Sequence, residues 1–95
     1  MELTGKQRRH LRALGHHTRP TVQIGSAGVS DAVAAKTTEE LDHHELIKVK
    51  VGQGLPVKDI ASALSEATDS HLVQVLGRTL LLYREHPEDP EIKLP

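Results

Sequence analysis

The segment ELIKVKV, residues 45–51, alternates between apolar and cationic side chains. From Ile47 to Val51 every second residue is apolar, and the residues between them are Lys48 and Lys50. Successive side chains of a β-strand point to opposite faces, so this period of two predicts a strand with one face in the core and one cationic face.

Toward the N-terminus, the β-branched run Thr21–Ile24 predicts a second strand. The loop Gly25–Gly28 follows it, and Ser30 is a good N-cap for a helix from Asp31 to about His43. The order strand, glycine loop, helix, strand therefore reads as a β-α-β unit.

Toward the C-terminus, the loop Gly52–Gly54 leads to a helix whose first turn contains Pro56. The apolar runs His71–Leu76 and Thr79–Tyr83 predict two more strands, separated only by Gly77–Arg78. A two-residue loop with Gly first predicts a type II′ hairpin.

A further helix precedes all of these elements. Thr4 and Gln7 have the spacing of a capping box, and Gly15 followed by Pro20 ends the helix. The helical period predicts a buried face of Leu3, Leu11 and Leu14. It predicts an opposite, exposed face of Arg8, Arg9 and Arg12.

The predicted order is therefore α-β-α-β-α-β-β. Two β-α-β units imply right-handed crossovers and parallel pairing, closed by the antiparallel hairpin. We predict a two-layer α/β domain with a mixed four-stranded sheet over residues 1–84. Residues 85–95, rich in acids and proline, are expected to form an irregular, solvated tail.

Composition narrows the function. The chain has 95 residues, no Cys, no Phe, no Trp and one Tyr, which argues against disulfides, thiolate metal sites and aromatic base-stacking platforms. It has no long apolar run, so we expect neither a membrane span nor a signal peptide, and a cytoplasmic location. The net charge is only -1, but the N-terminal segment is basic and the C-terminal segment is acidic. That asymmetry suggests a polyanionic partner, although ordinary surface charge also accounts for it.

Signals for catalysis and for metal binding are weak. The chain contains no G-x-S-x-G elbow and no Gly-rich nucleotide loop, so we expect neither an enzyme nor a bound cofactor. Among the seven histidines, His16–His17 and His43–His44 are adjacent pairs, which do not face each other on a helix. We interpret them as residues near helix ends and expect no metal, although His43, His44 and Glu45 are left open as partners of a distant ligand.

The loop Gly25-Ser26-Ala27-Gly28 has two interpretations. It is a simple turn, or it presents backbone N–H groups to a phosphate, as the G-x-x-G loop of KH modules does. Several cationic residues are candidate phosphate contacts that favour the second interpretation if they converge on the loop. They are Lys6, Arg8, Arg9, Arg12, Arg19, Lys48 and Lys50.

Four segments together resemble the CRM domain, the chloroplast RNA splicing and ribosome maturation domain, and above all its bacterial stand-alone YhbY-like members. They are LTGKQRRHLRALGH, PTVQIGSAGVSDAV, HHELIKVKV and VQVLGRTLLLYR. The resemblance runs from Leu3 to about Arg84. It implies a fold similar to the C-terminal domain of bacterial translation initiation factor three, with an extra helix in front. It also implies RNA binding through the G-x-x-G loop and the basic helix of residues 6–12.

The family's bacterial members look like factors that associate with precursors of the large ribosomal subunit. We therefore expect a monomeric RNA-binding protein that contacts ribosomal RNA or large-subunit precursors and assists ribosome assembly. The alternative is a protein-interaction module that docks on a ribosomal protein, which the charge asymmetry also suits. A third hypothesis, a metal-dependent hydrolase, has only the histidines in its favour.

Overall fold

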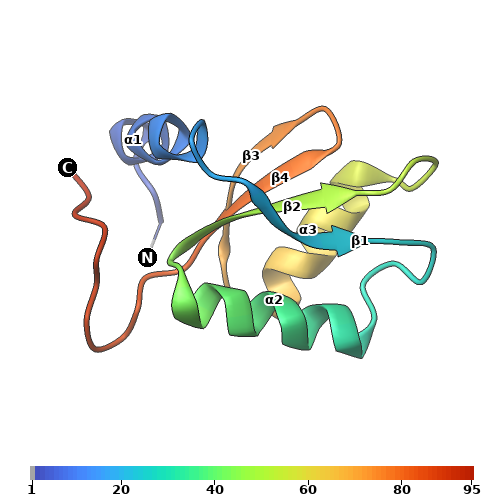
Figure 1. Ribbon diagram of the computed structural model, residues 1–95. Coiled ribbons are helices and arrows are strands. Elements are labelled where there is room, and N and C mark those ends of the chain that lie inside the picture. The colour runs from blue at the N-terminus through green and yellow to red at the C-terminus, as the bar shows by residue number, and fades with distance from the viewer. Residues whose placement is uncertain (1) are drawn as a thin grey trace.

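The computed structural model describes residues 2–95, which form three helices and one four-stranded sheet (Figure 1). The elements are α1 (Gly5–Gly15), β1 (Pro20–Ile24), α2 (Asp31–His43), β2 (Leu46–Val51), α3 (Val57–Ala67), β3 (His71–Leu76) and β4 (Thr79–Tyr83).

The sheet has the strand order β1-β2-β4-β3. β1 and β2 are parallel, and β4 is antiparallel to both of its neighbours. The α3 crossover therefore carries the chain from β2 past the place that β4 fills, so β3 is parallel to β2 without touching it. The predicted α/β class, element order and mixed four-stranded sheet are confirmed. The parallel pairing expected in the second β-α-β unit is wrong, because β4 lies between β2 and β3.

The sequence signals at the element ends have the expected geometry. The Thr4 hydroxyl accepts a hydrogen bond from the Gln7 amide at 3.1 Å, and the Gln7 side chain accepts one from the Thr4 amide at 3.0 Å. The Ser30 hydroxyl caps α2 by accepting from the Val33 amide. Gly77 has a φ of 60°, the positive value that the first central residue of a type II′ turn requires.

One face of the sheet is covered by α2 and α3 and holds the larger core. The odd-numbered residues Ile47, Val49 and Val51 of β2 lie on this face, and none is more than 1% exposed. Leu80 and Leu82 of β4 join them, as the period of two predicts. The helices contribute Leu41, Ile60, Ala61 and Leu64.

The opposite face is not bare, because α1 lies against β2, β3 and β4 there (Figure 1). Two layers were expected, and α1 adds a partial third. Leu11 of α1 packs with Leu81 and Tyr83 in a second, smaller core. Gly15 lets the helix approach closely, since a Cβ there would lie 2.8 Å from Leu81 Cδ2.

The predicted orientation of α1 is partly wrong. Leu11 is fully buried, but Leu14 is 40% exposed. Arg8 and Arg12, both expected to be exposed, are half-buried, whereas Arg9 is exposed as predicted. The Arg8 Nη1 donates to the carbonyls of Leu72 at 2.7 Å and Val73 at 3.3 Å. The register of β3 shifts between Leu72 and Gln74, and such an irregularity frees backbone groups from the ladder. Arg8 faces the sheet because it satisfies these carbonyls.

The tail of residues 85–95 is irregular, as expected. It is not solvated throughout, because several of its residues pack against the domain. The buried carboxylate of Glu45 accepts hydrogen bonds from the amides of His86, Glu91 and Ile92, each at 2.7 Å. Ile92 and Leu94 pack against the smaller core. The tail thus covers part of the sheet beside α1.

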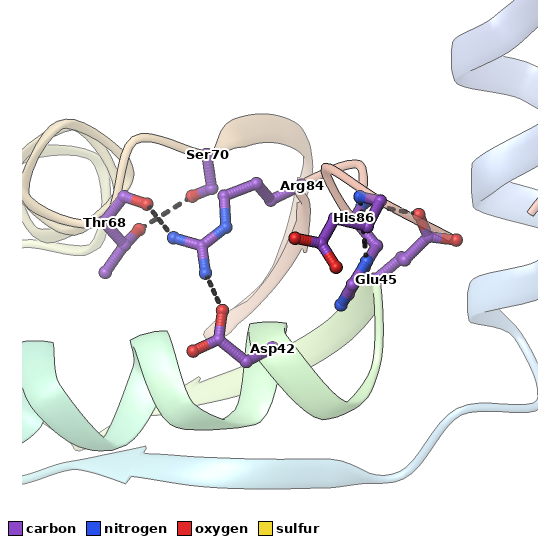
Figure 2. Close-up of polar contacts among 7 residues, drawn as sticks. Asp42, Glu45, Thr68, Ser70, Arg84 and His86 are labelled. Atoms are coloured by element: carbon purple, nitrogen blue, oxygen red, sulfur yellow. Dashed lines mark hydrogen bonds and ion pairs between the residues drawn. The ribbon is translucent and has the colours of Figure 1, made fainter. Parts of the chain in front are cut away.

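Arg84 ties the end of β4 to both covering helices, as Figure 2 shows. Its guanidinium donates to the Thr68 carbonyl just after α3 and pairs with the Asp42 carboxylate of α2. These two contacts join β4, α2 and α3 at the residue immediately before the tail.

Candidate functional site

The sheet face that carries α1 changes character along its strands. On β2, Leu46 is buried, Lys48 is half-buried and Lys50 is exposed. Their partners on β4 are Tyr83, Leu81 and Thr79. Exposure rises in the same direction on β4: Tyr83 is 0% exposed, Leu81 is 3% exposed and Thr79 is half-buried. We call the end under α1 and the tail the covered end, and the end around Lys50 and Thr79 the free end.

A hollow of about 110 Å³ lies where α1 ends above the sheet. Arg12 and His16 line it from α1 and its C-cap, and Lys48 lines it from β2. The hairpin contributes Gln74, Leu76, Thr79 and Leu81, and Gly15 of α1 also lines it. We call it the α1 hollow. Among the described residues, its lining contains two cations and no carboxylate.

A second hollow, of about 480 Å³, continues along the free end and shares Thr79 with the first. Lys50, Gln23, Gly52 and Gln53 are among its lining residues, and Arg78 borders it. None of the residues from 2 to 95 that line this hollow carries a carboxylate. Its far side is the end of β1, where the G-x-x-G loop begins.

Arg78 holds the loop that follows β2. Its Nε donates to the carbonyls of Val51 at 3.2 Å and Gly52 at 3.0 Å, and its Nη2 donates to those of Gly52 and Leu55. The Gly52 amide in turn donates to the Ile24 carbonyl at 2.9 Å. One hairpin arginine therefore fixes the loop that adjoins the end of β1.

The loop Gly25–Gly28 is an exposed β-turn, closed by a 2.9 Å hydrogen bond from the Gly28 amide to the Gly25 carbonyl. Gly28 has a φ of 65°, which favours glycine. A Cβ built on either glycine would meet nothing within 4 Å, so the turn faces open space. The start of α2 follows directly, and its N-terminus carries the positive end of the helix dipole.

The remaining predicted residues are spread over the molecule. Lys6 and Arg9 are exposed on α1, and one guanidinium nitrogen of Arg8 is already committed to backbone carbonyls. Arg19 stands before β1 and borders a different hollow with His44, whereas the G-x-x-G loop follows β1. A five-residue strand, roughly 16 Å long, separates Arg19 from the loop. Arg12, Lys48 and Lys50 are the predicted cations that share the free end.

Sequence reasoning missed Arg78 and considered Glu45 only as a possible ligand, not as the residue that holds the tail. A signal for the second role existed. Glu45 occupies the same parity as Ile47 and Val49 in the alternating segment, and an acid at an apolar position marks a buried, partnered carboxylate. Arg78 sits in a hairpin turn, where an arginine is ordinary. Its contacts with the Gly52 loop join parts of the chain that only the fold brings together.

Two side chains at the covered end have shifted pKa values. Burial raises the pKa of Tyr83 to about 12, with smaller contributions from Glu45 and Glu85. Burial also lowers the pKa of His71, and the charge of Arg8 adds to this effect. Both shifts favour neutral side chains, which fits an apolar end of the sheet face.

Within residues 2–95, no group of three or more His, Cys, Asp or Glu side chains is placed to hold a metal ion. In the same part of the chain no helix combines the length and apolar character that crossing a bilayer demands.

Comparison with known proteins adds the family. Residues 3–84 match the model of the CRS1 / YhbY (CRM) domain. The chain is 44% identical to the "Probable RNA-binding protein YqeI" of Bacillus subtilis, over 98% of this chain and 99% of that protein. It is 41% identical to an "RNA-binding protein" of Haemophilus influenzae, over 98% and 95% of the two chains.

A solved structure agrees with the sequence matches. The solution structure of SAV1595 from Staphylococcus aureus superposes with a TM-score of 0.84 at 46% identity, covering 99% of this chain and 100% of that one. With the family model spanning almost all of the body of the domain, the chain belongs to the CRS1/YhbY (CRM) domain family.

Proposed function

We propose that this protein binds RNA through the free end of the sheet face and the G-x-x-G loop. The observation that carries the proposal is the convergence of Arg12, Lys48 and Lys50 on two adjoining hollows that contain no carboxylate. Cations gathered in this way neutralise backbone phosphates, the sequence-independent part of nucleic-acid binding. The names of the relatives from Bacillus subtilis and Haemophilus influenzae support RNA as the ligand.

The G-x-x-G loop extends the same surface. The Gly52 amide bonds to the Ile24 carbonyl, so the end of the second hollow adjoins the turn. Ser26 and Ala27 are exposed and carry no bulk, and the start of α2 lies behind them. A phosphate on this turn would meet backbone amides and the positive end of a helix dipole.

We further propose that the RNA is ribosomal RNA or a precursor of the large ribosomal subunit, and that binding assists ribosome assembly. This step rests on the resemblance to the bacterial members of the family. Docking on a ribosomal protein is the second candidate, and the exposed side chains of Leu14 (40%) and Leu76 (65%) favour it.

Salt dependence tests the proposal. Affinity for a single-stranded RNA, measured by fluorescence anisotropy, should fall linearly with salt on logarithmic axes, by about 0.7 per phosphate neutralised. The double variant Lys48→Gln, Lys50→Gln should flatten this slope by about 0.7 for each phosphate that is no longer neutralised, with the fold intact by circular dichroism. A slope near zero in the parent would instead favour the protein-docking candidate.

The loop is tested by adding charge. The variant Ser26→Asp, Ala27→Asp should weaken RNA binding at least about tenfold near 0.1 M salt, because each carboxylate repels a nearby phosphate. The matched control is Ser62→Asp, Ala63→Asp, the same exposed dipeptide on α3, which covers the other face. Equal affinity of the two variants would reduce Gly25–Gly28 to a turn.

The ribosomal part has its own test. Crosslinking of the protein to RNA in living cells, followed by sequencing of the bound fragments, should recover large-subunit ribosomal RNA. Fragments drawn only from other RNAs would leave RNA binding in place and remove the role in assembly.

A further inference from the structure

The α1 hollow has properties that phosphate binding alone does not require. Besides its cations it contains the amide of Gln74, the hydroxyl of Thr79 and the apolar side chain of Leu76, which is 65% exposed. A site for a phosphate needs charge and N–H donors. A site for a nucleobase needs in addition a flat surface for the ring and a side chain that reads its edge.

The flat surface comes from His16 and Arg12. The chain has no Phe or Trp, and its single Tyr is buried at the covered end. Histidine rings and arginine guanidinium planes also stack on unpaired bases. His16 is exposed at the C-cap of α1 and lines the hollow, so its ring is accessible to a ligand.

The edge-reading groups come from the hairpin. The Gln74 amide offers both a donor and an acceptor, and the Thr79 hydroxyl can serve as either. Among residues 2–95, neither side chain is engaged in a hydrogen bond with another protein group, whereas Arg8 is committed to backbone carbonyls. Both groups are therefore available to a ligand that enters the hollow.

The size and charge of the α1 hollow allow it to hold an anionic group larger than water. The hollow measures about 110 Å³, several times the roughly 10–15 Å³ that a single water needs, so it admits a larger group. Lys48 and Arg12 stand at its wall, where they would meet the phosphate of the nucleotide that the hollow holds.

We propose that the α1 hollow receives one unstacked base of a single-stranded RNA, stacked on His16 and read by Gln74 and Thr79. This inference rests on the proposed function and deepens it, because it adds sequence preference to a surface that otherwise binds backbone. It also means that the lack of Phe and Trp does not exclude base stacking in this protein.

The experiment compares RNA homopolymers of equal length and charge: oligo(U), oligo(C) and oligo(A). The parent should prefer one of them at fixed salt. His16→Ala should weaken binding to the preferred oligomer about tenfold, the size expected for the loss of one base stack. His17→Ala is the matched control, since His17 is an adjacent exposed histidine outside the lining, and it should bind like the parent.

Two further variants separate recognition of the base edge from neutralisation of phosphates. Gln74→Ala and Thr79→Val should reduce the preference among the oligomers while leaving the salt slope unchanged. Equal binding of all oligomers by the parent, or His16→Ala binding like His17→Ala, would overturn the base site. If the protein binds RNA without a base site, the parent still shows a salt slope in either of these cases. A parent with no salt slope would contradict the proposed RNA binding itself.

Discussion

The covered and free ends of one sheet face are built from the same strands and differ in burial. At the covered end, Leu46 pairs with Tyr83 and both are buried under α1 and the tail. Four residues along β2, Lys50 pairs with Thr79 and faces solvent. The helix and the tail stop partway along the strands, so stability is concentrated at one end and ligand contact is possible at the other.

The largest expected difference between the two ends lies in α1. Leu11→Ala removes a fully buried side chain of the smaller core and should lower the free energy of unfolding by about 2–5 kcal/mol. Leu14→Ala on the same helix truncates a side chain that is 40% exposed and should cost far less. Urea denaturation measures both. Equal costs would mean that α1 is rotated relative to the sheet.

The next effect concerns the tail. Glu45→Gln removes the charge from a carboxylate that accepts three backbone hydrogen bonds, and should cost about 1.5–3 kcal/mol. Hydrogen exchange should quicken at the amides of His86, Glu91 and Ile92. Glu39→Gln, an exposed change on α2, is the control and should leave both measurements as in the parent. Unchanged exchange in Glu45→Gln would show that the tail is held by other contacts.

Tyr83 gives the covered end a pH dependence. Among residues 2–95 its buried hydroxyl has no hydrogen-bond partner, and burial raises its pKa from 10.0 to about 12. Below pH 10 the phenol is neutral in both folded and unfolded chains. As the pH rises from 10 toward 12 only the unfolded chain loses its proton, so stability should fall, by about 1.4 kcal/mol at pH 11.

Tyr83→Phe isolates this effect. The variant should equal or slightly exceed the parent in stability at pH 7, because it removes an unpaired buried hydroxyl. Urea denaturation at pH 7 and pH 11 should show a smaller alkaline loss in the variant than in the parent. The same loss in both would place the titrating group elsewhere.

The smallest effect on stability is expected at the free end. Lys50→Ala changes an exposed side chain and should alter the free energy of unfolding by no more than about 0.5 kcal/mol. Val49→Ala, one residue earlier on the fully buried face, should cost about 1–3 kcal/mol. Thermal or urea denaturation of the pair checks the division of β2 into a core face and a free face. A reversal of the two costs would contradict the strand register.

The sequence predicted the sheet well for two reasons: burial on the helix-covered face imposes a period of two on β2, and β3 and β4 are apolar runs on either side of the Gly77–Arg78 turn. The bounds predicted for β3 and β4 match, and β2 begins at Leu46, one residue later than expected. The face of α1 was harder to predict. It depends on the hydrogen bonds of Arg8 to carbonyls at the irregularity in β3, and on the close approach of Gly15 to Leu81. Both arise only in the folded chain.

The sequence names candidate cations, but only the fold shows which of them lie on one surface. Arg8 and Arg12 are four residues apart and lie on the same side of α1, yet Arg8 bonds to backbone carbonyls while Arg12 lines the α1 hollow. Residue type and spacing do not distinguish these two arginines. Their different contacts follow from where each lies over the sheet, which only the fold shows.

The contacts of Arg78 have a thermodynamic consequence for binding. Ordering a flexible side chain at an interface costs roughly 0.5–1.5 kcal/mol of conformational entropy, and ordering a mobile loop costs more. Arg78 already fixes the backbone of Gly52 and Leu55, and Gly52 is bonded to Ile24 at the base of the G-x-x-G turn. These contacts order the Gly52–Leu55 loop before any ligand arrives, so in the proposed RNA complex this loop should lose little conformational entropy.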